Sequence, residues 1–206
     1  MMHRLFVLLL AAFASVPALA TTPAYAQKSG PGTVAVRSAN EKIAKLLKTK
    51  APAAQVTASV QAFLDIDQLG KESMKDQWAK LKPAEQTEFL QTLRDLIQAN
   101  YLKAQKSNLS YSVDYVGEKK DKDGHIVVQT KIKTTRRGRP FSIAIDYVLI
   151  KNGKTLQAFD VITDGVGLVA NYRQMFNKVI RDKGFTGLMS RMKSKLEQIQ
   201  KADKKT

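Results

Sequence analysis

The sequence predicts an α+β domain in which helices come first, a four-stranded antiparallel meander follows, and helices close the chain. Apolar residues recur at helical spacing from Thr33 to Tyr101. From Tyr111 to Ile162 the period changes to two, and from Val166 to Ile199 helical spacing returns. A meander in which apolar and polar residues alternate has one apolar face. We therefore expect the helices to cover that face and the other face to be exposed to solvent.

The N-terminus has the features of a secretory signal peptide. A positive start at Met1–Arg4 precedes the apolar run Leu5–Ala14, which is shorter than the roughly 20 residues that a membrane-spanning helix needs. Small-x-small sites end at Ala20 and Ala26, and we expect cleavage after Ala26, with Ala20 as the alternative. The predicted organisation is therefore a signal peptide at 1–26, a linker at 27–32, one domain at 33–200 and a basic tail at 201–206.

Composition narrows the function further. The chain has no cysteine, which excludes disulfides, thiol redox chemistry and cysteine zinc sites. Its net charge of +16 would usually suggest nucleic acid, but an exported protein does not meet chromosomal DNA. We expect no nucleic acid among its partners. The remaining anionic partners are lipid headgroups, an acidic membrane surface or an acidic protein, and a solvated basic surface without a partner is the alternative.

Four helical stretches precede the strands. The first is predicted over Thr33–Lys48 and ends before Pro52; the second carries Val56 and Phe63 on one side; the third runs over Gln68–Lys80. The fourth begins at Lys82-Pro83, where proline suits the first turn of a helix. It carries the clearest apolar stripe of the chain, made of Phe89, Leu93, Leu96, Ile97 and Tyr101.

The strands are defined by alternation and by turns. Apolar residues alternate with polar ones in four runs, and the pair Asn152-Gly153 is a strong hairpin signal between the third and fourth. Two helices follow, with apolar sides that begin at Val166 and Phe185. The four strands are predicted around Tyr111–Tyr115, Ile126–Ile132, Phe141–Leu149 and Leu156–Ile162.

Reactive side chains do not form a catalytic pattern, so we predict that the protein is not an enzyme and has no cofactor or metal. His125 stands alone beside a polar turn, where a solvated histidine is expected. Asp65 and Asp67 could be a metal pair, but helix capping explains them better. Asp160 and Asp164 flank a strand end, as turn and cap residues do.

One hairpin tip concentrates positive charge. Arg136, Arg137 and Arg139 lie within four residues, and guanidinium groups bind phosphate or carboxylate well. The tip could therefore touch a lipid phosphate or dock an acidic partner; a soluble hairpin end is the alternative.

The stretch Phe159–Arg173, FDVITDGVGLVANYR, resembles the signature of the MlaC (toluene-tolerance) family. Asp164 stands where that signature usually has glutamate, and Gly167 where it has serine, which weakens any role of a longer carboxylate or a hydroxyl there. Further similar segments, from about Ala35 to Leu196, include Phe63–Asp67, Trp78, Lys82-Pro83, Phe89 and Gly184–Leu188.

The resemblance implies a soluble periplasmic carrier that encloses the acyl chains of a phospholipid and shuttles it between two membranes. It also implies partners, namely an inner-membrane ABC transporter complex and an outer-membrane lipid-transfer complex. A hopanoid-type lipid is an alternative cargo.

We expect a lipid cavity between the sheet and the helices, although the same residues would also fill a solid core. Arg136, Arg137, Arg139 and Arg173 would serve the headgroup or docking. The alternatives are a secreted cone-shaped α+β enzyme and a basic envelope adaptor without a ligand. The predicted lipid-binding residues are Val60, Phe63, Leu64, Phe89, Leu93, Tyr101, Ile132, Ile143, Ile145, Tyr147, Phe159, Val161, Val166, Val169 and Tyr172.

Overall fold

The computed structural model describes residues 29–105, 111–136 and 139–203, with the backbone alone for residues 101–105, 136 and 203. The predicted signal peptide lies outside these residues, as do residues 27–28 of the linker and 204–206 of the tail. The elements in chain order are α1 (Pro31–Lys48), α2 (Ala53–Phe63), α3 (Ile66–Met74), the 3₁₀ helix η2 (Lys75–Lys80), α4 (Pro83–Gln105), β1 (Tyr111–Lys120), β2 (Ile126–Arg136), β3 (Arg139–Asn152), β4 (Thr155–Thr163), β5 (Val166–Gly167) and α5 (Leu168–Asp203).

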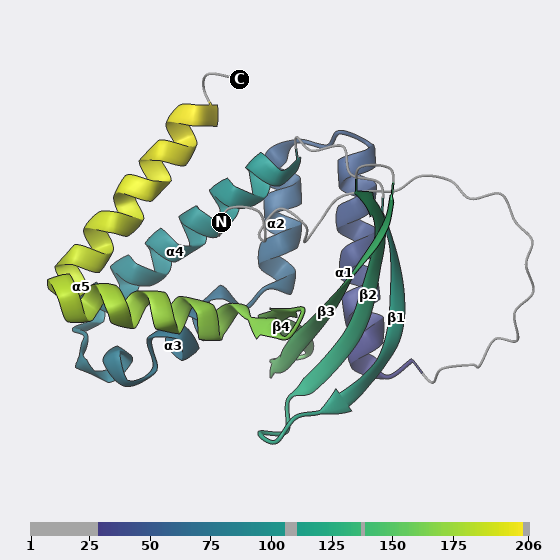
Figure 1. Cartoon of the computed structure of the whole chain (residues 1–206), viewed down its shortest axis with the longest axis horizontal. Coiled ribbons are helices and arrows are strands. Elements are labelled where there is room, and N and C mark those ends of the chain that lie inside the picture. The colour runs from purple at the N-terminus through teal and green to yellow at the C-terminus, as the bar shows by residue number, and fades with distance from the viewer. Residues whose placement is uncertain (1–28, 106–110, 137–138, 204–206) are drawn as a thin grey trace, which may run out of the picture.

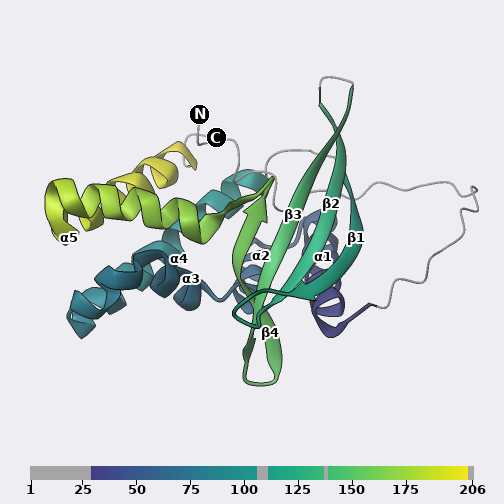
Figure 2. The ribbon, with the colours of Figure 1, turned by 60° about the horizontal axis from the view of Figure 1, so that its bottom comes forward.

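The predicted α+β order is confirmed. The sheet has the order β1-β2-β3-β4-β5, and every neighbouring pair is antiparallel. Helix α1 lies along one face of the sheet, while α3, α4 and α5 extend beyond the β4 side (Figure 1). Figure 2 shows the same arrangement from below, with α1 behind the strands and the long helices to one side.

The sheet contains five strands rather than the four predicted. The additional strand, β5, is formed by Val166 and Gly167, which pair with Thr163 and Ile162. Asp164 and Gly165 make the connecting turn with φ of 46° and 84°, the backbone shape of a two-residue hairpin turn. The prediction that Val166 lies on the following helix is therefore wrong, because α5 begins only at Leu168.

Helix ends follow the local sequence. Asp65 caps α3 by accepting a hydrogen bond from the Gln68 N–H at 2.9 Å, which confirms capping. At the start of α4, the Glu85 carboxylate accepts a hydrogen bond from the Lys82 N–H at 2.8 Å, as in a capping box.

Gly184 divides α5 into two arms, as the sequence predicted. Its φ of 68° and ψ of −179° are non-helical, and the two arms point in different directions in Figure 1. A positive φ is accessible to glycine at little cost. Among the described helices, none is long and apolar enough to cross a membrane.

Helix α1 is held close to the sheet by a carboxylate from β1. The Glu118 Oε2 atom accepts hydrogen bonds from the Thr33 N–H at 2.6 Å and from its hydroxyl at 3.0 Å. No acidic residue lies in the first turn of α1, so Glu118 supplies the negative charge that a helix N-terminus favours. A Cβ atom on Gly32 would lie 2.5 Å from Ile126 Cγ2, which shows how closely α1 approaches β2.

Candidate functional site

The predicted lipid-binding residues divide between two apolar layers. The sheet layer lies between one face of the sheet and α1 with the end of α2, and six of the predicted residues belong to its cluster. The buried members of the sheet layer are Val36, Phe63, Val128, Ile132, Ile143, Ile145, Tyr147, Leu149, Ala158 and Val161.

Strand register explains this layer. Ile132 pairs with Ile143 and Thr130 with Ile145, and Tyr147 pairs with both Val128 and Val161. Directly opposite residues point to the same face, so the alternation seen in the sequence becomes one continuous apolar surface.

The helical layer forms around α3, α4 and both arms of α5. Phe89 packs edge-on against Phe176 with ring centres 5.5 Å apart, and Phe176 stacks on Tyr172 at 5.3 Å. Of the predicted residues, Phe89, Leu93, Phe159 and Val169 are buried in this cluster, and Tyr172 packs against it. The predicted lipid-binding residues are therefore divided between the sheet layer and the helical layer.

The opposite face of the sheet was predicted to be exposed to solvent, but it is partly buried. Val127 and Val148 are neighbours of sheet-layer residues and so point the other way, yet both are buried in the helical layer. A register shift in β4 adds Phe159 to that layer: Val148 pairs with Asp160 and Leu149 with Ala158, which leaves Phe159 between them. Such a bulge redirects a side chain, and the even spacing of apolar residues did not reveal it.

The remaining predicted apolar residues lie elsewhere. Val60 is buried with Ile43 and Val56 in a small third cluster. Leu64 packs against all three clusters, and the adjacent Asp65 N–H binds the Ala158 carbonyl at 2.9 Å. Val166 is 56% exposed in β5, and the side chain of Tyr101 is outside the described residues.

The four predicted cationic residues are in different situations. Arg139 is exposed at the start of β3, whereas residue 137 and the side chain of Arg136 are outside the described residues. Arg173 holds α5 to α3, since its Nε and Nη2 atoms donate to the Glu72 carbonyl at 3.1 and 2.5 Å. Its guanidinium is engaged in this structure by the protein itself.

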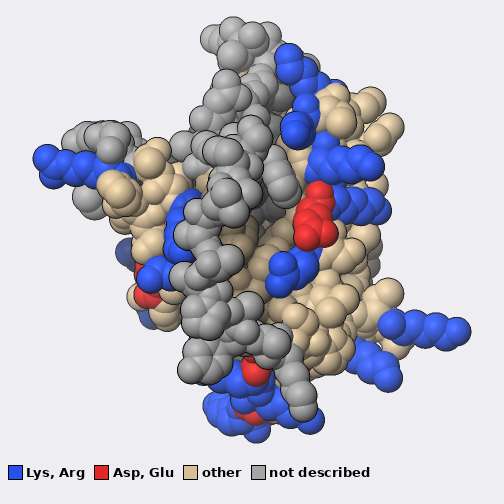
Figure 3. Space-filling view, turned by 90° about the vertical axis from the view of Figure 1, so that its right-hand side faces the viewer, with Lys and Arg blue, Asp and Glu red and all other residues tan. Residues whose placement is uncertain are grey.

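Among the charged side chains of the described surface, lysine and arginine prevail on the side of α1 and β1. Figure 3 shows this face largely in blue and tan, with little red. The distribution agrees with the net charge of +16 and would favour an anionic partner.

The sheet layer contains polar groups that the sequence did not single out. The Thr130 hydroxyl donates to the Ile145 carbonyl at 2.7 Å. Nearer the edge, Asn40 Nδ2 donates to the Tyr115 hydroxyl at 3.2 Å, and the Arg37 guanidinium lies 4.1 Å from the centre of the Tyr115 ring. Arg37 is exposed and Asn40 is half-buried on α1, and their partner Tyr115 is distant in the sequence, so only the fold reveals them.

Two phenols in this layer have raised pKa values. Burial raises the pKa of Tyr147 well above its usual range, because the phenolate would have no water around it. Burial also raises the pKa of Tyr115, and the opposing effects of Asn40 and Arg37 are smaller. Both hydroxyls are therefore neutral hydrogen-bonding groups at physiological pH.

Two aspartates considered as candidate reactive groups have structural roles. Asp160 accepts hydrogen bonds from the Val161 and Val169 N–H groups at 2.8 and 3.0 Å, so it caps α5. Burial raises the Asp160 pKa, although these hydrogen bonds oppose the shift. Asp164 Oδ1 accepts a hydrogen bond from the Ala144 N–H at 3.1 Å and extends the sheet.

The turn between β1 and β2 contains one group of possible metal ligands among the described residues: Asp121, Asp123 and His125. Asp121 Oδ1 accepts hydrogen bonds from the backbone N–H groups of Asp123 and His125, and Oδ2 lies 3.0 Å from His125 Nδ1. The His125 ring also packs edge-on against Phe159. The expectation of a solvated histidine is therefore wrong, and turn geometry explains the cluster.

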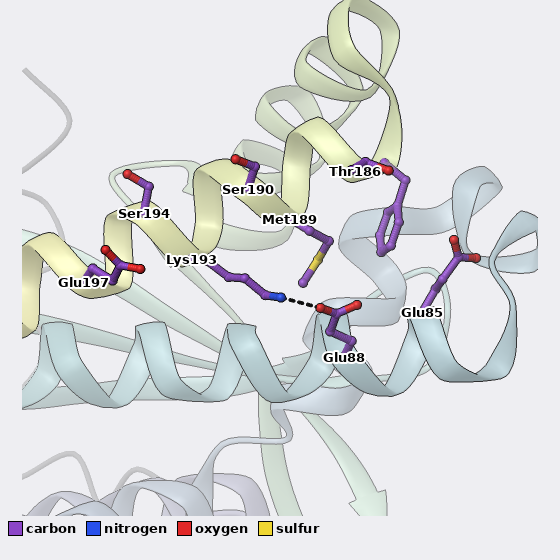
Figure 4. A pocket seen from close by; sticks show the side chains of 9 residues that line it. Glu85, Glu88, Thr186, Met189, Ser190, Lys193, Ser194 and Glu197 are labelled. Atoms are coloured by element: carbon purple, nitrogen blue, oxygen red, sulfur yellow. Dashed lines mark hydrogen bonds and ion pairs between the residues drawn. The ribbon is translucent and has the colours of Figure 1, made fainter.

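Figure 4 shows an open groove of about 510 Å³ between α4 and the second arm of α5. Lys193 crosses it to Glu88, with Nζ and Oε1 2.5 Å apart. Charged and hydroxyl side chains make this groove unsuitable for acyl chains, and none of the predicted lipid-binding residues lines it. Its lining is Glu85, Glu88, Phe185, Thr186, Met189, Ser190, Lys193, Ser194 and Glu197.

Fold and site together define an α+β protein in which an antiparallel sheet and its helices enclose two apolar layers. The family model described as MlaC protein matches residues 34–194, and the chain belongs to the MlaC family. No curated protein matches the chain.

Among solved structures, the chain is similar to the phospholipid-binding protein from Ralstonia solanacearum, determined in complex with a phospholipid. The two share 20% sequence identity and a TM-score of 0.68, over 81% of this chain and 97% of the other. At this identity the likeness shows a common fold.

Proposed function

We propose that the protein binds a phospholipid with its acyl chains against the sheet layer and carries it through the periplasm. Membership of the MlaC family, over residues 34–194, is the observation that carries this proposal. The related fold of the R. solanacearum protein, which was solved with a phospholipid, gives independent support.

Elementary energetics explain why such a carrier is needed. Two acyl chains contain on the order of 30 methylene groups, and exposing each to water costs about 0.8 kcal/mol. A lipid diffusing alone would therefore face a cost above roughly 20 kcal/mol. An apolar layer replaces the membrane interior at little cost, so transfer in either direction can be nearly isoenergetic.

The sheet layer is the better candidate for the tails. It combines long β-strands with a cover formed by α1, whose buried Val36 lies against the strands, and by the end of α2. The helical layer is instead bound by stacked aromatic rings and by Arg173, which join α3, α4 and α5.

Lipid recovery from the native compartment is the first test. Protein released from the periplasm under gentle conditions should carry phospholipid, detected by native mass spectrometry and by extraction. Repeated recovery of lipid-free protein would contradict the proposal.

A matched pair of variants locates the tails. Ile143→Trp fills the sheet layer and Leu188→Trp fills the helical layer, and both sites are 2% exposed. Overpacking should cost each variant about 1–3 kcal/mol. Only Ile143→Trp should lose co-purifying phospholipid; the reverse result would move the tails to the helical layer.

The proposed route has two further parts. Export would depend on the signal peptide at 1–26, and N-terminal sequencing of the secreted form should begin at Gln27. Delivery between an inner-membrane ABC transporter complex and an outer-membrane complex would use the basic surface. Transfer of labelled phospholipid to such complexes should weaken as salt rises, whereas salt-independent transfer would count against docking by charge.

A further inference from the structure

One edge of the sheet layer carries a polar cluster drawn from three different elements. The first two members lie on α1, the third on β1 and the fourth on β3. The polar cluster consists of Arg37, Asn40, Tyr115 and Tyr147.

These side chains form a connected set around Asn40. Its Nδ2 atom donates to the Tyr115 hydroxyl at 3.2 Å, and the Asn40 side chain also lies near the Tyr147 hydroxyl, whose pKa it lowers against the larger effect of burial. Arg37 stands over the other side of Tyr115, with its guanidinium carbon 4.1 Å from the ring centre. The geometry thus links an arginine at the surface to a hydroxyl inside the layer.

Burial within the polar cluster is graded. Tyr147 is 1% exposed and packs its ring against Phe63 with centres 5.8 Å apart. Asn40 and Tyr115 are half-buried, and Arg37 is exposed. Neutral donors therefore lie deep and the positive charge lies outside, which is the order in which a glycerophospholipid presents its ester oxygens and its phosphate.

An apolar layer gains nothing from these groups. Phenylalanine would fill the place of either tyrosine with no hydroxyl to remove from water. The hydroxyls and the amide contribute only if they bind each other or bind a ligand. Asparagine and tyrosine donate to ester carbonyl oxygens, and arginine pairs with phosphate through charge-assisted hydrogen bonds.

We propose that the polar cluster binds the polar end of the cargo, with Arg37 on the phosphate and Asn40 and Tyr147 on the ester oxygens. The inference rests on the proposed function and makes it more specific. The cargo class is a diacyl glycerophospholipid, and the layer would select it over lipids that lack either the phosphate or the esters.

Competition between matched lipids tests this selectivity. Vesicles containing equal amounts of phosphatidylglycerol, the corresponding diacylglycerol and the corresponding dialkyl-ether phosphatidylglycerol are offered to the delipidated full mature protein. Native mass spectrometry then gives the ratio of bound species. Arg37→Gln should lower the preference for phosphatidylglycerol over diacylglycerol by about fivefold, the effect of roughly one hydrogen bond.

The role of Asn40 and Tyr147 is measured by the preference for ester over ether lipid. Asn40→Ala and Tyr147→Phe should lower the preference for ester over ether lipid, again by about fivefold. Ser73→Ala is the control, because it removes a buried hydroxyl group from α3, away from the polar cluster. It should leave both preferences unchanged.

The outcomes separate this inference from the proposed function. Uptake of all lipids with wild-type ratios in all three cluster variants would overturn the inference and leave the carrier intact. If the polar cluster only holds α1 against the sheet, the lipid ratios of the variants would equal those of the wild type, and Asn40→Ala would only lower the free energy of unfolding. Wild-type protein that takes up no lipid would instead refute the proposed function. Arg37 is exposed, so Arg37→Gln should fold and keep the test decisive.

Discussion

Removing the Asp160 carboxylate tests whether the family-like segment Phe159–Arg173 has a structural role. Asp160 accepts hydrogen bonds from the Val161 and Val169 N–H groups at 2.8 and 3.0 Å, and these bonds fix the start of α5 against β4. Asp160→Ala would leave both donors without this acceptor. At about 1 kcal/mol for each hydrogen bond, the loss is about 2 kcal/mol, at the upper end for an N-cap.

Asp160→Asn separates the hydrogen bonds from the charge. Asparagine keeps an acceptor and is an equally good cap, and burial already raises the Asp160 pKa, so the site does not favour the charge. We expect Asp160→Asn to cost less than half of the alanine value. Because the folded-state pKa is raised, the stability linked to this group is fully present below the unfolded value of 3.8 and is lost as pH rises through the folded value. That pH-dependent part should be absent in Asp160→Asn.

Urea denaturation followed by circular dichroism, repeated at several pH values, measures both effects. A loss of about 2 kcal/mol in a chain of 206 residues corresponds to a fall in Tm of about 4–8 °C. The reasoning would be refuted if Asp160→Ala cost less than about 0.5 kcal/mol, or if asparagine were as costly as alanine.

Three further variants probe other parts of the molecule. Glu118→Ala should loosen α1, at a cost of about 1–2 kcal/mol, because it removes the acceptor of both Thr33 hydrogen bonds; hydrogen exchange should rise in α1, and unchanged protection would contradict the assignment. Phe89→Ala opens a cavity in the helical layer, where Phe89 is 0% exposed, and should cost about 3–5 kcal/mol in urea denaturation; a cost under 1 kcal/mol would mean that the layer collapses around the gap. Burial opposes the charged form of Asp121, but hydrogen bonds from His125 outweigh it and lower the Asp121 pKa. The stability that Asp121 contributes is therefore present above pH 3.8 and is lost as pH falls through the lower folded value. The plot of unfolding free energy against pH should be flatter for Asp121→Asn in this acid range, and a plot identical to that of the wild type would exclude the linkage.

Local signals predicted most of the fold correctly. The α+β order, the capping by Asp65 and the break at Gly184 each depend on residues near one another in the sequence. The fifth strand was missed even though Asp164-Gly165 is itself a hairpin signal. That pair followed a strand by so few residues that it was taken for the entry to a helix.

The site was harder to predict because it depends on contacts between distant segments. Alternation placed Ile143, Ile145 and Tyr147 on one face correctly. It could not place Phe159, since one unpaired residue in β4 changes the face on which the side chain lies. Arg173 resembled a free cation because its partner, the Glu72 carbonyl, lies 101 residues away. The polar cluster was missed for the same reason, since Asn40 and Tyr115 are 75 residues apart.

The extra residue in β4 has a mechanical consequence. With Phe159 directed to one side of the strand and Val161 to the other, a single strand forms part of the wall of two separate interiors. Under the proposed function, the sheet layer would take up and release the acyl chains while the helical layer stays joined by the Phe89–Phe176 contact and by Arg173.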